Sequence, residues 1–389
     1  PETLAAAKEI QNEEYRADAL SALAQKLPPE LFPETLAAAK EIQSDKHCAN
    51  ALIALAQKLP PELLPEALAA AKEIQSDKHR ADALSALAQK LPPELFPETL
   101  AATKEIQNEE YRANALSALA QKLPPELLPE ALAAAKEIQS DKHRANALIA
   151  LAQKLPPELL PEALAAARDI QNEEYRADAL SALAQKLPEL LPETLVAVRE
   201  IQSKYYRANA LSALAQKLPP ELLPEALAVV REIQDEEYRA NALSALADKL
   251  PELLPETLAA VREIQDEKYR ANALIALADK LPELLPEALA AVRGIQSDKH
   301  RANALIALAD KLPELLPETL AAVSKIQDEY GNRANALSAL AQKLPPELLP
   351  EALAVVREIQ SDKHRANALI ALADKLPELL PETLAAVSK

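Results

Sequence analysis

The sequence predicts an all-α protein, a right-handed α/α solenoid (superhelix) of about twelve helix-pair repeats. The tetrapeptide PETL or PEAL recurs every 31 to 33 residues along the 389-residue chain. Each period holds two apolar stripes with helical spacing, and prolines separate the two stripes. Aromatic residues make up only 3% of the chain, so the core must be thin and shared between stacked helix pairs.

The repeats define a single tandem-repeat domain that spans residues 1–389. Repeats differ in length only at turns, where packed helices tolerate insertions: KLPPEL alternates with KLPEL, and one unit has an extra residue at Gly331–Asn332. The units begin at Pro1, Pro33, Pro65, Pro97, Pro129, Pro161, Pro192, Pro224, Pro255, Pro286, Pro317 and Pro350, and a partial unit begins at Pro381.

The first helix of a repeat is illustrated by residues 235–250. Asp235 stands at the expected N-cap, where every unit has Asn, Ser or Asp, and acids follow in the first turn. Leu243, Leu246 and Leu250 follow at spacings of three and four and form one helical stripe. Pro251 ends this helix.

The second helix is expected from Pro255 to about Gln265. Residues 251–254 are expected to form a short turn or kinked lead-in, because a residue before proline is pushed out of the α region. The whole chain should then contain about 25 helices, twelve first and thirteen second. The apolar stripe of the second helix is Leu258, Val261 and Ile264.

Charge and composition exclude several classes of function. The net charge of −17 disfavours binding to nucleic acid and to anionic membranes. No run of 18 apolar residues is present, and the single cysteine, Cys48, permits no internal disulfide. No segment addresses the compartment, and we expect a cytoplasmic location.

The residues predict no catalytic site, and therefore no enzyme and no cofactor. No Ser-His-Asp or Cys-His set stands apart from the repeats, and two glycines cannot form a glycine-rich phosphate loop. Histidine shares one slot of the first helix with tyrosine, and neighbouring units about 10 Å apart are too distant for a shared zinc ion. No metal site is expected at His47, His79, His143, His300 or His364.

An arginine recurs in the first turn of the first helix, where its charge opposes the helix dipole. Its recurrence predicts a specific partner, a carboxylate or helix-end carbonyl in the next unit, and so an inter-repeat ladder. Ligand contact is the alternative reading, and Cys48 in the second unit is read as drift. The row comprises Arg16, Arg80, Arg112, Arg144, Arg176, Arg207, Arg239, Arg270, Arg301, Arg333 and Arg365.

The order of an early arginine, the run ALSALA at 242–247, a proline turn and PELLPETLAAV resembles the short HEAT-like repeats of bilin-lyase-like proteins and designed α-repeat scaffolds. The arrays of bacterial signalling NTPases are also similar. The resemblance implies a charged ladder between repeats. It also implies a concave face lined by second helices, with contact positions at Glu225, Ala228, Arg231 and Glu232.

The leading hypothesis is a non-enzymatic scaffold array that binds a protein or peptide. Its surface is nearly the same in every unit, which suits a repetitive or multivalent partner or a spacer. The alternatives are a spacer or sensor arm of a larger signalling protein, or an engineered scaffold. Near-identical units suit design or recent duplication, whereas the single oddities at Cys48, Gly294 and Gly331 suit natural drift.

Both ends of the chain read like interior repeats rather than polar caps. Leu4, Ile10 and Leu384 are therefore expected to be partly exposed. Either the native protein continues past both ends, or the ends stack head to tail on other copies, which sedimentation over a range of concentrations would detect.

Overall fold

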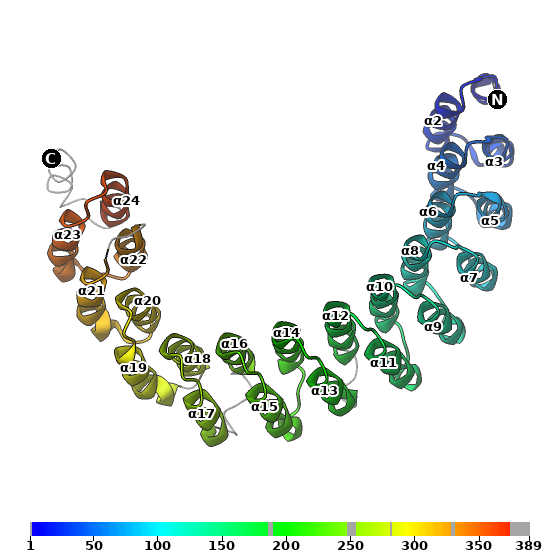
Figure 1. The fold of residues 1–389 in the computed structure, drawn as a ribbon. Coiled ribbons are helices and arrows are strands. Elements are labelled where there is room, and N and C mark those ends of the chain that lie inside the picture. Colours follow the sequence, from blue (N-terminus) through cyan, green and yellow to red (C-terminus); the bar gives the residue numbers. More distant parts are fainter. Residues whose placement is uncertain (1, 186–189, 247–253, 281, 328–330, 374–389) are drawn as a thin grey trace. The chain divides into compact units, whose positions relative to one another are not determined.

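A computed structural model describes residues 2–185, 190–246, 254–280, 282–327 and 331–373. These residues form 24 α-helices and no strand, and consecutive helices pack as an α/α solenoid, as the sequence predicts (Figure 1). The predicted helix after Pro381 lies outside the described residues. No helix in the described part is long and apolar enough to cross a membrane.

The helices alternate between two types. Short 3-10 helices precede many of the second helices, at Pro29–Leu31, Pro61–Leu63, Pro93–Leu95, Pro125–Leu127, Pro157–Leu159, Pro220–Leu222, Pro282–Leu284, Pro313–Leu315 and Pro346–Leu348. The first helices are α2 (Glu13–Ala24), α4 (Asp45–Ala56), α6 (Asp77–Ala88), α8 (Glu109–Ala120), α10 (Asp141–Ala152), α12 (Glu173–Ala184), α14 (Lys204–Ala215), α16 (Glu236–Leu246), α18 (Glu267–Lys280), α20 (Asp298–Leu308), α22 (Asn332–Ala341) and α24 (Asp362–Ala373). The second helices are α1 (Glu2–Lys8), α3 (Phe32–Lys40), α5 (Leu64–Glu73), α7 (Phe96–Lys104), α9 (Leu128–Lys136), α11 (Leu160–Arg168), α13 (Leu191–Arg199), α15 (Leu223–Arg231), α17 (Leu254–Arg262), α19 (Leu285–Gly294), α21 (Leu316–Ser324) and α23 (Leu349–Arg357).

The array divides into two compact units, residues 1–206 and 207–389, where the sequence predicts a single domain. The boundary falls inside α14. Such a division is natural in a solenoid, because each repeat packs only against its neighbours and nothing ties distant repeats together.

The first helices begin at the predicted N-caps except α22, which begins after Gly331, and the caps differ in kind. The Asp235 carboxylate accepts a hydrogen bond from the backbone of Glu237 at 3.1 Å, and Asn108 caps α8 in the same way. Ser44, Ser76 and Ser140 have the extended cap backbone but no side-chain cap bond, so that part of the prediction was wrong. Ser203 and Ser297 do accept a backbone amide, both at 3.4 Å, so serine can cap this helix but does so with long bonds.

In the second repeat the lead-in to the second helix is a turn of 3-10 helix with sequence PEL, which runs directly into the α-helix. The predicted lead-in at residues 251–254 falls, up to residue 253, outside the described residues. In the repeat of residues 235–265, α17 begins at Leu254, one residue before Pro255, and ends at Arg262 rather than Gln265. In four PETL segments the threonine is fully buried and its hydroxyl donates to a carbonyl four residues earlier, at 2.7 Å; these are Thr35, Thr99, Thr194 and Thr319. That bond allows Thr and Ala to interchange at this core position.

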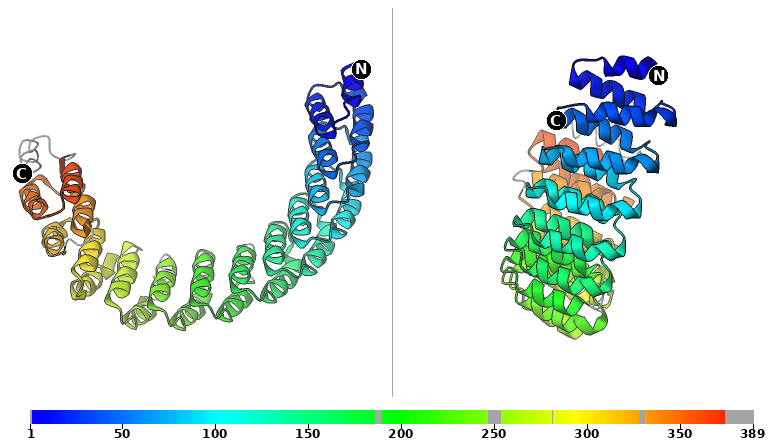
Figure 2. Two further views of the ribbon diagram at one scale, coloured as in Figure 1. Left: turned by 45° about the horizontal axis from the view of Figure 1, so that its top comes forward. Right: turned by 90° about the vertical axis from the view of Figure 1, so that its right-hand side faces the viewer.

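Within each unit, the first helices pack side by side in one layer and the second helices form the other (Figures 1 and 2). Figure 1 shows the first helices on the inner side of each unit's curve and the second helices on the outer side. The expectation that second helices line the concave face was therefore wrong. First helices approach closely because alanines such as Ala113 and Ala115 are fully buried between them, whereas neighbouring second helices pack less directly on one another.

The N-terminal helix is covered better than its sequence suggests. Leu4 is fully buried, because α1 turns it toward α2, while Ile10 is half-buried. The expectation of an exposed Leu4 was wrong, and Leu384 lies outside the described residues. Head-to-tail association, which stays a prediction, cannot draw on Leu4.

The two glycines give a matched pair of substitutions. Gly331 has a φ of +71°, and a Cβ there would lie 2.7 Å from the His364 side chain. Gly331→Ala should lower the free energy of unfolding by about 2 kcal/mol, because a left-handed backbone is strained with a side chain. Gly294 is the last residue of α19, where a Cβ would meet nothing within 4 Å, so Gly294→Ala should raise the free energy of unfolding by about 0.5 kcal/mol. Urea unfolding measures the free energy change of each variant. Equal changes would contradict the conclusion that only Gly331 needs a left-handed backbone.

Candidate interaction surfaces

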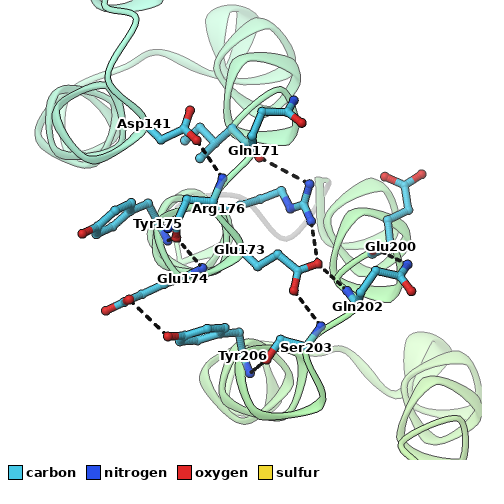
Figure 3. Close-up of polar contacts among 12 residues, drawn as sticks. Asp141, Gln171, Glu173, Glu174, Tyr175, Arg176, Glu200, Gln202, Ser203 and Tyr206 are labelled. Atoms are coloured by element: carbon cyan, nitrogen blue, oxygen red, sulfur yellow. Dashed lines mark hydrogen bonds and ion pairs between the residues drawn. The ribbon is translucent and has the colours of Figure 1, made fainter.

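At eight junctions in the described part of the chain, successive repeats are joined through the first acid of a first helix. In Figure 3, the carboxylate of Glu173 accepts hydrogen bonds from the backbone amides of Gln202 at 2.6 Å and Ser203 at 2.7 Å, in the next repeat. Arg176 donates to the same carboxylate at 3.1 Å and to the Ile170 carbonyl at 3.3 Å. The acid therefore joins two repeats, and the arginine holds the acid in place.

The same bond recurs along the described part of the chain, with N–O distances of 2.6 to 3.0 Å. Glutamate often receives two amides and aspartate one, because the longer side chain reaches both. Lys204 stands at this position in α14. The acids are Glu13, Asp45, Asp77, Glu109, Asp141, Glu173, Glu236 and Glu267, and their donors lie 29 to 31 residues later.

The arginine row lies at these junctions, but only some of its members contact the next repeat as expected. Arg80, Arg144 and Arg333 do reach an acceptor in the next repeat, at 3.4 to 3.5 Å. Arg239 binds Glu236 and Arg270 binds the Ile264 carbonyl, both within one repeat. The acid that forms the main bond between repeats was not predicted, although an acid stands three residues before nine of the eleven arginines, which was a visible signal.

At two of these junctions the bonds lower the pKa of the acid. Backbone amides of Gln43 and Ser44 lower the pKa of Glu13. Burial, the largest single influence on Glu109, would raise its pKa, but hydrogen bonds from Gln139 and Ser140 together with Arg112 outweigh it, and the pKa is lowered. The ionised forms of Glu13 and Glu109 are therefore stabilised in the folded chain.

A pH dependence follows from that direction. Because the folded pKa of Glu109 lies below its unfolded value of about 4.3, its contribution is fully present above that pH and is lost as the pH falls through the folded pKa. The stability difference between the parent and Glu109→Gln should therefore shrink between pH 6 and pH 3. Urea unfolding at both values measures it, and an unchanged difference would contradict the charged bond.

A second ladder runs along the layer of second helices. A basic residue in the last turn of one second helix pairs with an acid in the first turn of the next, as in Lys72–Glu98 and Lys136–Glu162, both at 2.7 Å. These side chains are more than one-third exposed, so each pair contributes little to stability. The four positions predicted for the concave face belong to this outer layer, on α15 and the residue after it, and Arg231 lies 3.8 Å from Glu263.

The layer of first helices presents one exposed carboxamide or carboxylate in every repeat. Within the described residues, none of the nine asparagines in this row is held by a hydrogen bond from its carboxamide. We call these residues the inner row. They are Asp18, Asn50, Asp82, Asn114, Asn146, Asp178, Asn209, Asn241, Asn272, Asn303, Asn335 and Asn367.

The slot shared by tyrosine and histidine lies beside the inner row. The Tyr206 hydroxyl donates to Glu174 of the preceding repeat at 3.1 Å (Figure 3), and Tyr269 donates to Glu237 at 2.9 Å. These bonds raise the pKa of both phenols. Among the residues that the structure describes, no three His, Cys, Asp or Glu side chains are arranged to hold a metal ion.

The second unit has a cleft of about 350 Å³ between α18 and α20. Asn272 and Asn303 of the inner row face it, together with Lys268, His300 and the apolar Ile275. Burial lowers the pKa of His300, and the nearby Lys268 lowers it further, so the imidazole is neutral at pH 7. The cleft therefore combines hydrogen-bonding groups, one cation and an apolar wall.

No protein-family model and no curated protein match the sequence. Among solved structures, Kap121p bound to Nup53p has a TM-score of 0.66 and 13% identity and covers 99% of this chain and 50% of its own. Kap121p bound to RanGTP has a TM-score of 0.62 and 14% identity, and the match covers 99% of this chain and 50% of that one. Kap121p alone has a TM-score of 0.56 and 13% identity, with coverages of 99% and 54%. The chain thus spans about half the length of the structures it matches.

At these identities the likeness shows the fold alone. The matched structures are HEAT-repeat solenoids, which confirms the predicted helical-repeat architecture. The comparisons do not support the resemblance to the arrays of bacterial signalling NTPases.

Proposed function

We propose that the chain is a non-enzymatic repeat array that binds an extended protein or peptide segment along its layer of first helices. The observation that carries this proposal is the inner row, one exposed and unbonded carboxamide in most repeats. A carboxamide both donates and accepts hydrogen bonds, as a peptide group does, so it can pair with the backbone of a partner irrespective of the partner's side chains.

The spacing of the row fits an extended chain. Neighbouring helices pack about 8–10 Å apart, and an extended polypeptide advances about 3.3 Å per residue. One inner-row residue would therefore meet about every third residue of the partner. Because the row repeats with little change, it favours a partner with a repetitive sequence or several equivalent segments.

The structural neighbours agree with this class of function. Kap121p, a solenoid of the same fold, has been crystallised with Nup53p and with RanGTP. Nup53p and RanGTP are partners of Kap121p. Because Kap121p has the same fold, its complexes support a protein partner for this chain as well.

A peptide selection tests the proposal. A display library of random peptides about 12 residues long, enough to cover four repeats, is selected on the full chain. Selected peptides should bind Asn272→Ala/Asn303→Ala at least about tenfold more weakly, because each lost hydrogen bond contributes about 1 kcal/mol.

The matched control is Glu225→Ala/Arg231→Ala, which alters two of the positions first expected to line the concave face. It should leave peptide affinity unchanged, since these residues belong to the outer layer. Loss of binding in this variant and not in the asparagine variant would move the surface to the second helices. A library that yields no specific peptide would overturn the proposal.

A further inference from the structure

One repeat of this array lacks the side chain that fills the junction in its sister repeats. Residues 44–63 and 140–159 have the same sequence except that Cys48 replaces Arg144. The second and fifth repeats therefore offer the same site with and without its guanidinium group.

The fifth repeat shows what the guanidinium group binds. Nη2 of Arg144 donates to Oδ1 of Asp141 at 2.7 Å and to the Asp169 carbonyl at 3.4 Å. The other carboxylate oxygen of Asp141 accepts the Asn172 amide of the next repeat at 2.7 Å. Arg80 repeats both contacts of the guanidinium, with Asp77 at 2.7 Å and the Glu105 carbonyl at 3.5 Å.

The second repeat keeps the acceptors and lacks the donor. Oδ2 of Asp45 accepts a hydrogen bond from the Ser76 amide at 2.7 Å, as Oδ2 of Asp141 does from Asn172. Oδ1 of Asp45 is then the atom that corresponds to the arginine-binding oxygen of Asp141. A cleft of about 310 Å³ remains, lined by Asp45, Cys48 and Glu73 among other residues. Because Sγ of Cys48 takes the place of the arginine Cγ, the missing atoms amount to one N-methylguanidinium ion.

We propose that this cleft is a binding site for a guanidinium group, with N-methylguanidinium as its smallest complete ligand. The carboxylates of Asp45 and Glu73 supply charge complementarity, and Asp45 offers the planar carboxylate that guanidinium prefers. Lys40 also lines the cleft, but its ammonium group is paired with Glu66 at 3.1 Å. This site is distinct from the polypeptide surface proposed above.

The thiol does not compete for the cation. Burial, together with the charges of Asp45, Glu73 and Glu13, raises the pKa of Cys48 to about 11, so the sulfur is protonated and uncharged at neutral pH. The same carboxylates that raise this pKa favour a cation beside the sulfur.

Equilibrium dialysis of the full chain against labelled N-methylguanidinium at physiological salt tests the proposal. The parent should bind one equivalent in roughly the millimolar range, which suits a single small cation. Cys48→Arg fills the cleft and should lose this equivalent. Arg144→Cys opens the matching cleft in the fifth repeat and should raise the stoichiometry from one to two.

Two comparisons define the ligand. N-methylurea, which has nearly the same shape and no charge, should bind at least about tenfold more weakly, because the pair is charge-assisted. Acetyl-Ala-Arg-Ala-amide distinguishes an arginine side chain of a partner from a free small guanidine, and binding of either supports the site. Equal uptake by the parent and Cys48→Arg would show adventitious attraction to the acidic surface and would overturn the proposal, as would an unchanged stoichiometry in folded Arg144→Cys.

Discussion

Glu109→Ala is expected to lower the free energy of unfolding by about 2–3 kcal/mol. The substitution removes the acceptor of two charge-assisted bonds, from the Gln139 amide at 2.8 Å and the Ser140 amide at 2.7 Å. It also leaves the guanidinium of Arg112 without the carboxylate 3.6 Å away. Urea unfolding followed by circular dichroism gives the change, and hydrogen exchange at Gln139 and Ser140 locates it.

Glu110→Ala is the matched control for this experiment. It removes the same charge from the adjacent residue, whose side chain is exposed. Its effect on unfolding should stay within about 0.5 kcal/mol. If the two variants unfold alike, the junction bond contributes nothing beyond net charge, and the acid is only a first-turn residue that favours the helix dipole.

Leu148→Ala is expected to cost about 3 kcal/mol. Leu148 lies on α10 and is fully buried, in the apolar stripe that packs between the two layers. Removing its isopropyl group leaves a cavity, and helices held from both sides by neighbouring repeats cannot collapse to fill it. The midpoint of urea unfolding should fall accordingly.

The adjacent residue provides the comparison. Ile149 is half-buried, and sister repeats carry serine in its place, as at Ser117 and Ser181. Ile149→Ser should therefore cost less than about 1 kcal/mol, because the serine hydroxyl can bond a carbonyl four residues earlier, as Ser117 bonds Ala113 at 2.7 Å. If both substitutions lower the free energy of unfolding equally, the fully buried Leu148 and the half-buried Ile149 contribute alike to the core, which would contradict their difference in burial.

The repeat pattern predicted the fold because the sequence of each unit contains the signals for both of its helices. Leu243 and Leu246 repeat at helical spacing, and Asp235 marks a helix start, so periodicity alone placed both helices of a repeat. Which layer faces inward was not predictable in this way. The inward-facing layer depends on how closely helices of each type approach their neighbours. Buried alanines such as Ala113 and Ala115 allow the first helices to approach closely, and this becomes visible only in the packed structure.

The candidate surfaces show the same limit. The row at Arg176 was visible in the sequence, but its role was assigned by analogy to a charged ladder. The stronger bond uses backbone amides, such as those of Gln202 and Ser203, as donors. Backbone donors leave no mark in a sequence, so only the acceptor, Glu173, could have been noticed.

The junction bond gives the array an unusual freedom of length. Its acceptor belongs to one repeat and its donors to the backbone of the following repeat, so any repeat that carries the acid can precede any other. Glu109 reaches donors 30 and 31 residues ahead, and Glu173 reaches donors 29 and 30 ahead, because the proline turn between them is one residue shorter. Whole units can thus be gained or lost by unequal recombination without creating a mismatched interface, and chains of different reach are accessible to selection in single genetic steps.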